Sequence, residues 1–94
     1  MVTERPAKVC GIHFFNPAPM MKLVEVIRAS DTSDETVAAL TELGKRMTRV
    51  PVTVADMPGF LVNMGGRAFS SEGLRIVHES VATPAQVDAI LENV

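Results

Sequence analysis

Two residues near the start of the chain have the types and the spacing that acid–base chemistry needs. His13 and Glu25 lie twelve positions apart, each inside an otherwise apolar run. Imidazole is the side chain that most readily exchanges a proton near neutral pH. A carboxylate that binds one imidazole nitrogen fixes the tautomer, so that the other nitrogen can accept a proton. The pair therefore has the composition of a general base oriented by a second group.

The elements that would bring the pair together are two strands joined by a loop with two prolines. Residues 9–15 and 23–27 alternate in the pattern of strands, and residues 16–22 form the loop. If the chain folds back about Pro19, position 15 faces 23, 13 faces 25 and 11 faces 27. Side chains that face each other in this way have Cβ atoms about 5 Å apart, within reach of a hydrogen bond. The spacing alone favours a structural pair that closes a hairpin over a catalytic pair.

The same residues carry a resemblance to a known family. The run HFFNP at residues 13–17, then Pro19, Met21 and LVEVI at 23–27, resembles the catalytic segment of the 3-hydroxyacyl-CoA dehydrogenases. The run PGFLVN at residues 58–63 is similar to the segment where that family's nucleotide-binding domain passes into its helical C-terminal domain. The motifs occur in the family's order, and the likeness covers nearly the whole chain.

This resemblance implies an enzyme that oxidises an L-3-hydroxyacyl-CoA to the 3-oxoacyl-CoA with NAD. The pathway would be fatty acid beta-oxidation or 3-hydroxybutyryl-CoA metabolism. It implies that His13 takes the proton of the 3-hydroxyl group and that Glu25 pairs with His13. It further implies that Asn63 contacts the acyl-CoA substrate and that Asn16 lies beside the nicotinamide end of the cofactor. Met64 departs from the pattern, because the family commonly has arginine there, and any salt bridge of that arginine is in doubt.

The segment after the two strands is expected to contain one helix and one strand. Thr32 and Glu35 have the spacing of a capping box, which predicts that the helix begins there. Its buried stripe includes Leu43 or Gly44, and Pro51 is expected to stop it. A short strand is then predicted over residues 52–54.

The last third of the chain is expected to be helical. A long helix is predicted from about residue 59 to 80, with Pro58 in its first turn. Gly65 and Gly66 weaken this helix, which indicates either a closely packed neighbouring backbone or a simple weak point. A final helix should begin at the capping box that Thr83 opens.

Together these elements define an α/β fold class. We expect a partial Rossmann-like unit (β-hairpin, helix, strand) followed by a long helix and the start of an all-α domain. Residues 1–57 would form the C-terminal part of the NAD-binding domain. Residues 58–94 would start the helical C-terminal domain for dimerisation and substrate binding. The long helix carries apolar residues on more than one face, so we expect a homo-oligomer formed through it.

Composition excludes several other classes of protein. The chain has 94 residues and a net charge of -2, and no basic patch with interleaved aromatic residues predicts nucleic-acid binding. Its apolar runs are shorter than the ~20 residues of a membrane span, and the N-terminus lacks a signal-peptide core, so we expect a cytoplasmic protein without membrane contact. We interpret the single Cys10 as a buried residue without a chemical role. His13 and His78 are too isolated from each other to predict a metal site.

The missing glycine-rich turn decides what this chain could do alone. A dehydrogenase of this type needs Gly-x-Gly-x-x-Gly at a helix N-terminus to bind the pyrophosphate of NAD. None of the six glycines has that spacing. We therefore expect a central fragment of the enzyme that is nearly inactive by itself, with NAD bound mainly by residues absent from this chain. The alternative is a non-catalytic helical module that self-associates or binds a partner.

Overall fold

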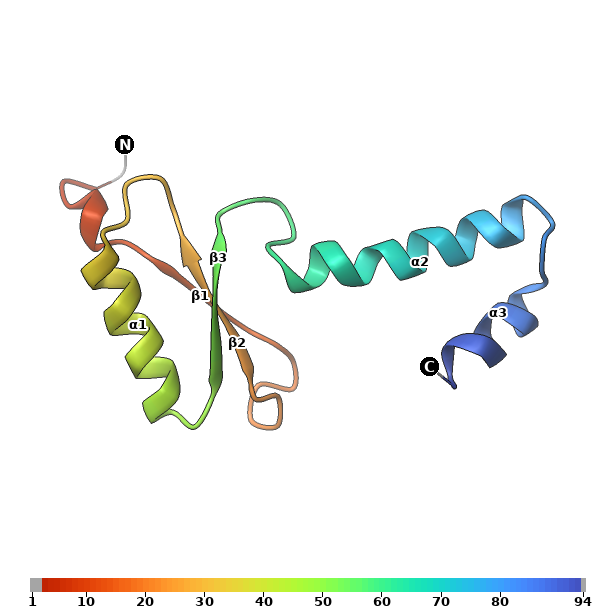
Figure 1. Cartoon of the computed structure of the whole chain (residues 1–94), viewed down its shortest axis with the longest axis horizontal. Coiled ribbons are helices and arrows are strands. Elements are labelled where there is room, and N and C mark those ends of the chain that lie inside the picture. The colour runs from red at the N-terminus through yellow and green to blue at the C-terminus, as the bar shows by residue number, and fades with distance from the viewer. Residues whose placement is uncertain (1–2, 94) are drawn as a thin grey trace. The chain divides into compact units, whose positions relative to one another are not determined.

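The chain forms two compact units, Met1–Leu61 and Val62–Val94, and the computed structural model describes residues 3–93. The elements of the first unit are a short 3-10 helix η1 (Pro6–Lys8), β1 (Gly11–Phe14), β2 (Leu23–Arg28), α1 (Asp34–Arg46) and β3 (Val50–Ala55). The second unit contains α2 (Val62–His78) and α3 (Pro84–Leu91) (Figure 1).

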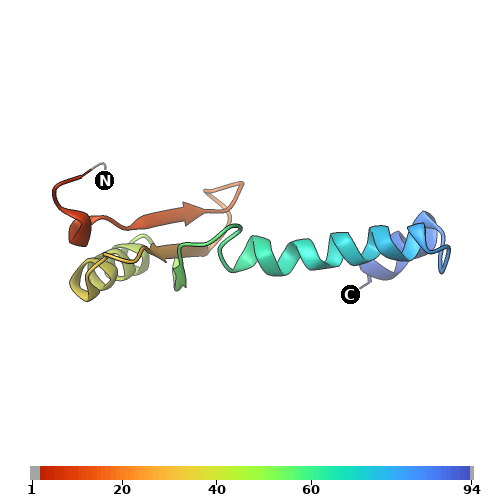
Figure 2. The same ribbon diagram turned by 90° about the horizontal axis from the view of Figure 1, so that it is seen from above.

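The first unit is a three-stranded sheet in the order β1-β2-β3. Strand β1 is antiparallel to β2, and β2 is parallel to β3. Parallel neighbours need a crossover connection, which α1 supplies. In Figure 1 α1 runs alongside the strands, and Figure 2 shows the same helix foreshortened beside the sheet. The hairpin, helix and strand of the expected α/β unit are therefore present.

The register between β1 and β2 is the one expected from the sequence. His13 pairs with Glu25, and Gly11 pairs with Ile27. Strand β2 is the central strand, and the side chains of Val24, Glu25 and Val26 are completely buried. The core of the unit therefore surrounds the strand that carries the carboxylate.

Helix α1 begins one residue later than the sequence predicted. Ser33 is the N-cap, and its hydroxyl accepts a hydrogen bond from the backbone N–H of Thr36. Thr32 is instead buried, donates its hydroxyl proton to the carbonyl of Val9 at 2.7 Å, and accepts from the N–H of Ala29. The capping box of Thr32 and Glu35 was therefore a wrong prediction, because a bond to the segment before β1 uses the Thr32 hydroxyl.

The end of α1 also differs from the expectation. The helix stops at Arg46 and a turn follows, in which Thr48 has a φ of 60°. Pro51 therefore does not end the helix but lies in β3, at the edge of the sheet, where a missing N–H is tolerated. Of the two candidates for the buried stripe, Gly44 is buried and Leu43 is largely exposed.

Helix α2 begins at Val62, three residues after the predicted start. Pro58 is not in the first helical turn. It occupies a reverse turn closed by the N–H of Phe60, which donates to the carbonyl of Met57 at 2.9 Å. Proline followed by Gly59 with a φ of 80° is typical of a type II turn. Pro58 therefore marks a reverse turn before the helix and not the first turn of the helix.

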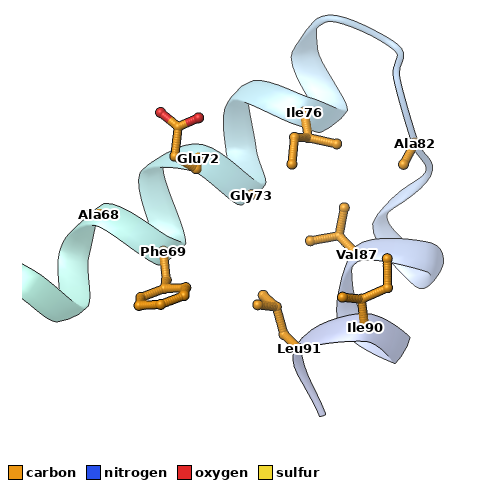
Figure 3. A pocket seen from close by; sticks show the side chains of 9 residues that line it. All are labelled: Ala68, Phe69, Glu72, Gly73, Ile76, Ala82, Val87, Ile90 and Leu91. Atoms are coloured by element: carbon orange, nitrogen blue, oxygen red, sulfur yellow. The ribbon is translucent and has the colours of Figure 1, made fainter. Parts of the chain in front are cut away.

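Helix α3 has the predicted start. Thr83 is the N-cap, Pro84 is the first helical residue, and the reciprocal hydrogen bonds of Thr83 and Gln86 complete the capping box. Helices α2 and α3 border an apolar groove of about 360 Å³, shown in Figure 3. Among residues 3–93, no helix combines the length and the hydropathy that a membrane span requires.

Candidate active site

The imidazole of His13 is hydrogen-bonded to the carboxylate of Glu25. The Nδ1 and Oε2 atoms are 2.8 Å apart, and the side chains are 31% and 0% exposed. An ionised carboxylate can only accept, so Nδ1 carries the proton of this bond and the neutral ring keeps its lone pair on Nε2. A buried acceptor beneath a partly exposed imidazole is the arrangement that a general base needs.

The second oxygen of the same carboxylate binds a backbone group. The N–H of Leu61 donates to Glu25 Oε1 at 3.0 Å, across thirty-six positions of the sequence. Two donors on two oxygens hold the carboxylate in one orientation. The role of Leu61 could not be predicted from the sequence, because a backbone amide has no side-chain signature. The one available signal was the proline–glycine pair at 58–59, which predicts a turn.

Two phenylalanine rings flank the His13 imidazole. The ring centroid of Phe15 lies 4.8 Å from that of His13, and the centroid of Phe60 lies 5.4 Å away, both rings being tilted. These distances fall in the range of favourable aromatic pairs. Phe15 follows β1 directly, and Phe60 belongs to the turn before α2, so two separate segments restrict the ring.

Asn16, the predicted cofactor contact, lies at the start of the loop between β1 and β2. Its side chain is exposed, and the peptide bond to Pro17 is cis. The far end of the loop is fixed by Arg49, whose Nη1 donates to the carbonyl of Met21 at 2.8 Å, and by the N–H of Val50, which donates to the carbonyl of Lys22. The loop that carries Asn16 is therefore anchored to the start of β3.

Asn63, the predicted substrate contact, is an exposed residue in the first turn of α2. It belongs to the second unit, whereas His13 and Glu25 belong to the first. The role of Asn63 stays a prediction.

Cys10 lies beside the site without belonging to it. Its thiol donates a hydrogen bond to the carbonyl of Ile27 at 3.1 Å. Burial raises the pKa of the Cys10 thiol, and the nearby Arg28 opposes this only in part. A thiol with a raised pKa is a poor nucleophile at neutral pH. Residues 3–93 contain no group of three potential metal ligands.

Comparison with known proteins places this arrangement in a class. Residues 1–57 match the family described as "3-hydroxyacyl-CoA dehydrogenase, NAD binding domain". A probable 3-hydroxybutyryl-CoA dehydrogenase from Bacillus subtilis is 43% identical over 91 residues, which are 97% of this chain and 32% of that protein. The chain belongs to the 3-hydroxyacyl-CoA dehydrogenase family.

Other relatives and solved structures agree with this assignment. A 3-hydroxyadipyl-CoA dehydrogenase from Escherichia coli is 44% identical over 90 residues, 96% of this chain and 19% of that protein. The crystal structure of the (S)-3-hydroxybutyryl-CoA dehydrogenase from Ralstonia eutropha matches with a TM-score of 0.86 and 42% identity, over 90% of this chain and 30% of that one. The chain thus spans about a third or less of the length of these relatives.

One further neighbour has a different substrate in its description. A pyridine carboxylic acid dehydrogenase, described as an NAD+ dependent dismutase, matches with a TM-score of 0.87 at 30% identity, over 95% of this chain and 29% of that one. Proteins whose names state different substrates therefore share the backbone of this segment.

Proposed function

We propose that this chain is the base-bearing segment of an NAD-dependent 3-hydroxyacyl-CoA dehydrogenase, which oxidises an L-3-hydroxyacyl-CoA to the 3-oxoacyl-CoA. The observation that carries the proposal is the 2.8 Å contact between Nδ1 of a partly exposed His13 and the buried Glu25. Support for this substrate class comes from the 44% and 42% identity to a 3-hydroxyadipyl-CoA dehydrogenase and a 3-hydroxybutyryl-CoA dehydrogenase.

In this proposal His13 is the general base. Nε2 takes the proton of the 3-hydroxyl group while C3 becomes a carbonyl carbon, and NAD, when bound, accepts the hydride from C3. Glu25 stabilises the imidazolium that forms, because its negative charge lies 2.8 Å from Nδ1 in a site without water contact on the carboxylate. The partial exposure of His13 leaves room for the hydroxyl group to approach.

The helix N-termini of this chain do not fit the pyrophosphate of NAD. At α1 the cap is Ser33, and Asp34 and Glu35 follow in the first turn, where their charges would repel a phosphate. The Leu61 amide before α2 is bonded to Glu25, and α3 begins with a closed capping box. We therefore propose that residues outside this chain hold most of the cofactor, with Asn16 near the nicotinamide, and that the isolated chain is nearly inactive.

The remaining assignments follow from the same proposal. Residues 1–57 would complete the NAD-binding domain, and residues 58–94 would begin the helical domain, in which Asn63 contacts the acyl-CoA substrate. The enzyme would form a homo-oligomer through α2.

Replacing His13 in a complete enzyme tests the proposed function. In the Bacillus subtilis relative, this chain would replace the matching segment. NADH formation by the chimeric enzyme from (S)-3-hydroxybutyryl-CoA would then be measured. A His13→Gln change should lower kcat by roughly 10²- to 10⁴-fold, because glutamine cannot take the proton. The matched control is His78→Gln at the exposed end of α2, which should leave kcat unchanged. Equal turnover in the His13→Gln protein would remove His13 from the mechanism.

A second candidate, a self-associating helical module, is supported by exposed apolar residues of the helical unit. Phe69, Leu74 and Ile90 are each more than 60% exposed. Light scattering of the 94-residue chain should show a dimer or a larger species if these faces associate. A monomer at all concentrations would argue against this candidate.

A further inference from the structure

The turn from Met57 to Leu61 has a conformation that its sequence does not favour. Gly59 has a φ of 80°, which glycine adopts at no steric cost, but the next residue, Phe60, also has a positive φ, 47°. A bulky L-residue in the left-handed region is strained, and such strain persists only where surrounding contacts enforce it. The contacts that enforce this turn are therefore informative.

Besides the hydrogen bond from the Phe60 N–H that closes the turn, two contacts of the turn lead to the His13–Glu25 pair. The Leu61 N–H donates to Glu25 Oε1 at 3.0 Å, and the Phe60 ring lies 5.4 Å from the His13 imidazole. If Phe60 left the left-handed region, the following amide would turn away from the carboxylate. The strained residue thus sets both the direction of the Leu61 N–H and the position of the ring on His13.

We propose that this turn is a positioning element for the base. The Leu61 backbone N–H fixes the Glu25 carboxylate, and through it the Nδ1–H tautomer and the ring orientation of His13. Leu61 and Phe60 are positioning residues, since neither reaches the reacting atoms. The catalytic meaning of the element rests on the proposed function, but the fixation of the tautomer does not.

Replacing the Leu61 amide by an ester tests this proposal directly. Leucic acid, incorporated at position 61 of the full 94-residue chain, keeps the leucine side chain and replaces the N–H by an ester oxygen that cannot donate. The ring nitrogens of ¹⁵N-labelled His13 report the tautomer, with His78 as an internal reference. In the unaltered chain Nδ1 should be protonated and Nε2 bare. In the ester chain the ratio of the Nδ1–H to the Nε2–H tautomer should fall several-fold.

Two matched variants separate positioning from general stability. Leucic acid at Leu40 removes an amide N–H inside α1, and it should loosen the helix without moving the His13 nitrogens. Leu61→Ala removes the side chain but keeps the N–H, and it should also leave the His13 nitrogens unchanged. Unchanged His13 nitrogens in a folded ester chain at position 61 would overturn the proposal.

A second measurement applies if the ester chain does not fold. In the otherwise unaltered chain, the Leu61 amide proton should exchange slowly with solvent. Glu25→Met, which removes both acceptor oxygens, should speed its exchange while the amide of Gln86 at the start of α3 stays unaffected. No change in the Leu61 exchange would contradict the proposal. Failure of the proposed function gives a different pattern: the tautomer responds as described, yet the chimeric enzyme turns over equally with His13→Gln.

Discussion

The two units of this chain differ in how they use their apolar residues. In the sheet unit Val24 and Val26 have no exposed surface, and Ile27 and Val54 are nearly as buried. In the helical unit none of residues 62–93 is buried. Each unit has apolar side chains, but only the sheet unit has enclosed them.

Two glutamates, Glu25 of the sheet unit and Glu72 of the helical unit, show the same contrast. The Glu25 carboxylate is fully buried and receives His13 and the Leu61 amide, whereas Glu72 and Arg75 on α2 are more than half exposed. A buried polar group needs fixed partners, while an exposed pair is screened by water. The difference teaches that the sheet unit holds its buried carboxylate with fixed partners inside a core, whereas the described helical residues 62–93 leave their charged and apolar side chains exposed or half-buried.

Truncating a valine of the sheet core should produce the larger of two contrasted effects. Val26→Ala should lower the free energy of unfolding by about 2 kcal/mol, since it removes buried methyl groups and leaves a cavity. Leu74→Ala on α2, where the side chain is 75% exposed, should change it by less than about 0.5 kcal/mol. Urea unfolding, monitored through the amide signals of residues in β2, measures the change in the free energy of unfolding for both variants. Equal losses would mean that Leu74 is buried in solution and that the contrast between the units is wrong.

Two helical glycines should respond to alanine with opposite signs. A Cβ atom at Gly44 would lie 3.2 Å from the Cβ of Pro51 and 3.4 Å from Cγ1 of Val24, so Gly44→Ala should destabilise the sheet unit by about 1 kcal/mol. A Cβ atom at Gly65 meets nothing within 4 Å, so Gly65→Ala should stabilise α2 by up to about 1 kcal/mol. Thermal unfolding monitored by circular dichroism gives the sign of the stability change for each variant. Destabilisation by Gly65→Ala would indicate a close neighbour on that face of α2.

The sequence predicted the hairpin well because its information is local and periodic. Alternation fixes which residues share a face, and a loop symmetric about Pro19 leaves one register that pairs His13 with Glu25. The capping box at Thr83 was equally local, and it is confirmed. Features set by one hairpin or one helix turn could therefore be predicted from the sequence.

The features that were missed depend on distant partners. Thr32 and Ser33 are both good helix caps, and the choice between them is made by the Val9 carbonyl, which takes the Thr32 hydroxyl. Likewise, Pro58 suits either a helix start or a turn, and the bond from Leu61 to Glu25 accompanies the turn. Catalytic roles need substrate and cofactor, so no sequence pattern settles them without a family resemblance.

The smallest predicted effect is the pH dependence of α2. Arg75 donates to Glu72 through Nη2 at 2.7 Å and through Nε at 3.0 Å, and these hydrogen bonds, with the positive charge, hold the pKa of the Glu72 carboxyl below its ordinary value of 4.5. A carboxyl whose pKa is lower in the folded state stabilises that state above the ordinary value. This contribution is lost as the pH falls through the lowered pKa.

Circular dichroism of the chain between neutral pH and strong acid measures this loss of helix. Glu72→Gln should remove a slight, salt-sensitive part of the acid-induced change, because a fully exposed pair is screened. Arg75→Met leaves Glu72 without its donor and also removes the bond from Arg75 Nη1 to Glu79 Oε1, so it should remove at least as much of the acid-induced change as Glu72→Gln. A large effect of Glu72→Gln at high salt would show that the pair is shielded from water. The helical unit would then have an enclosed face after all, and the contrast with the buried pair of Glu25 would narrow.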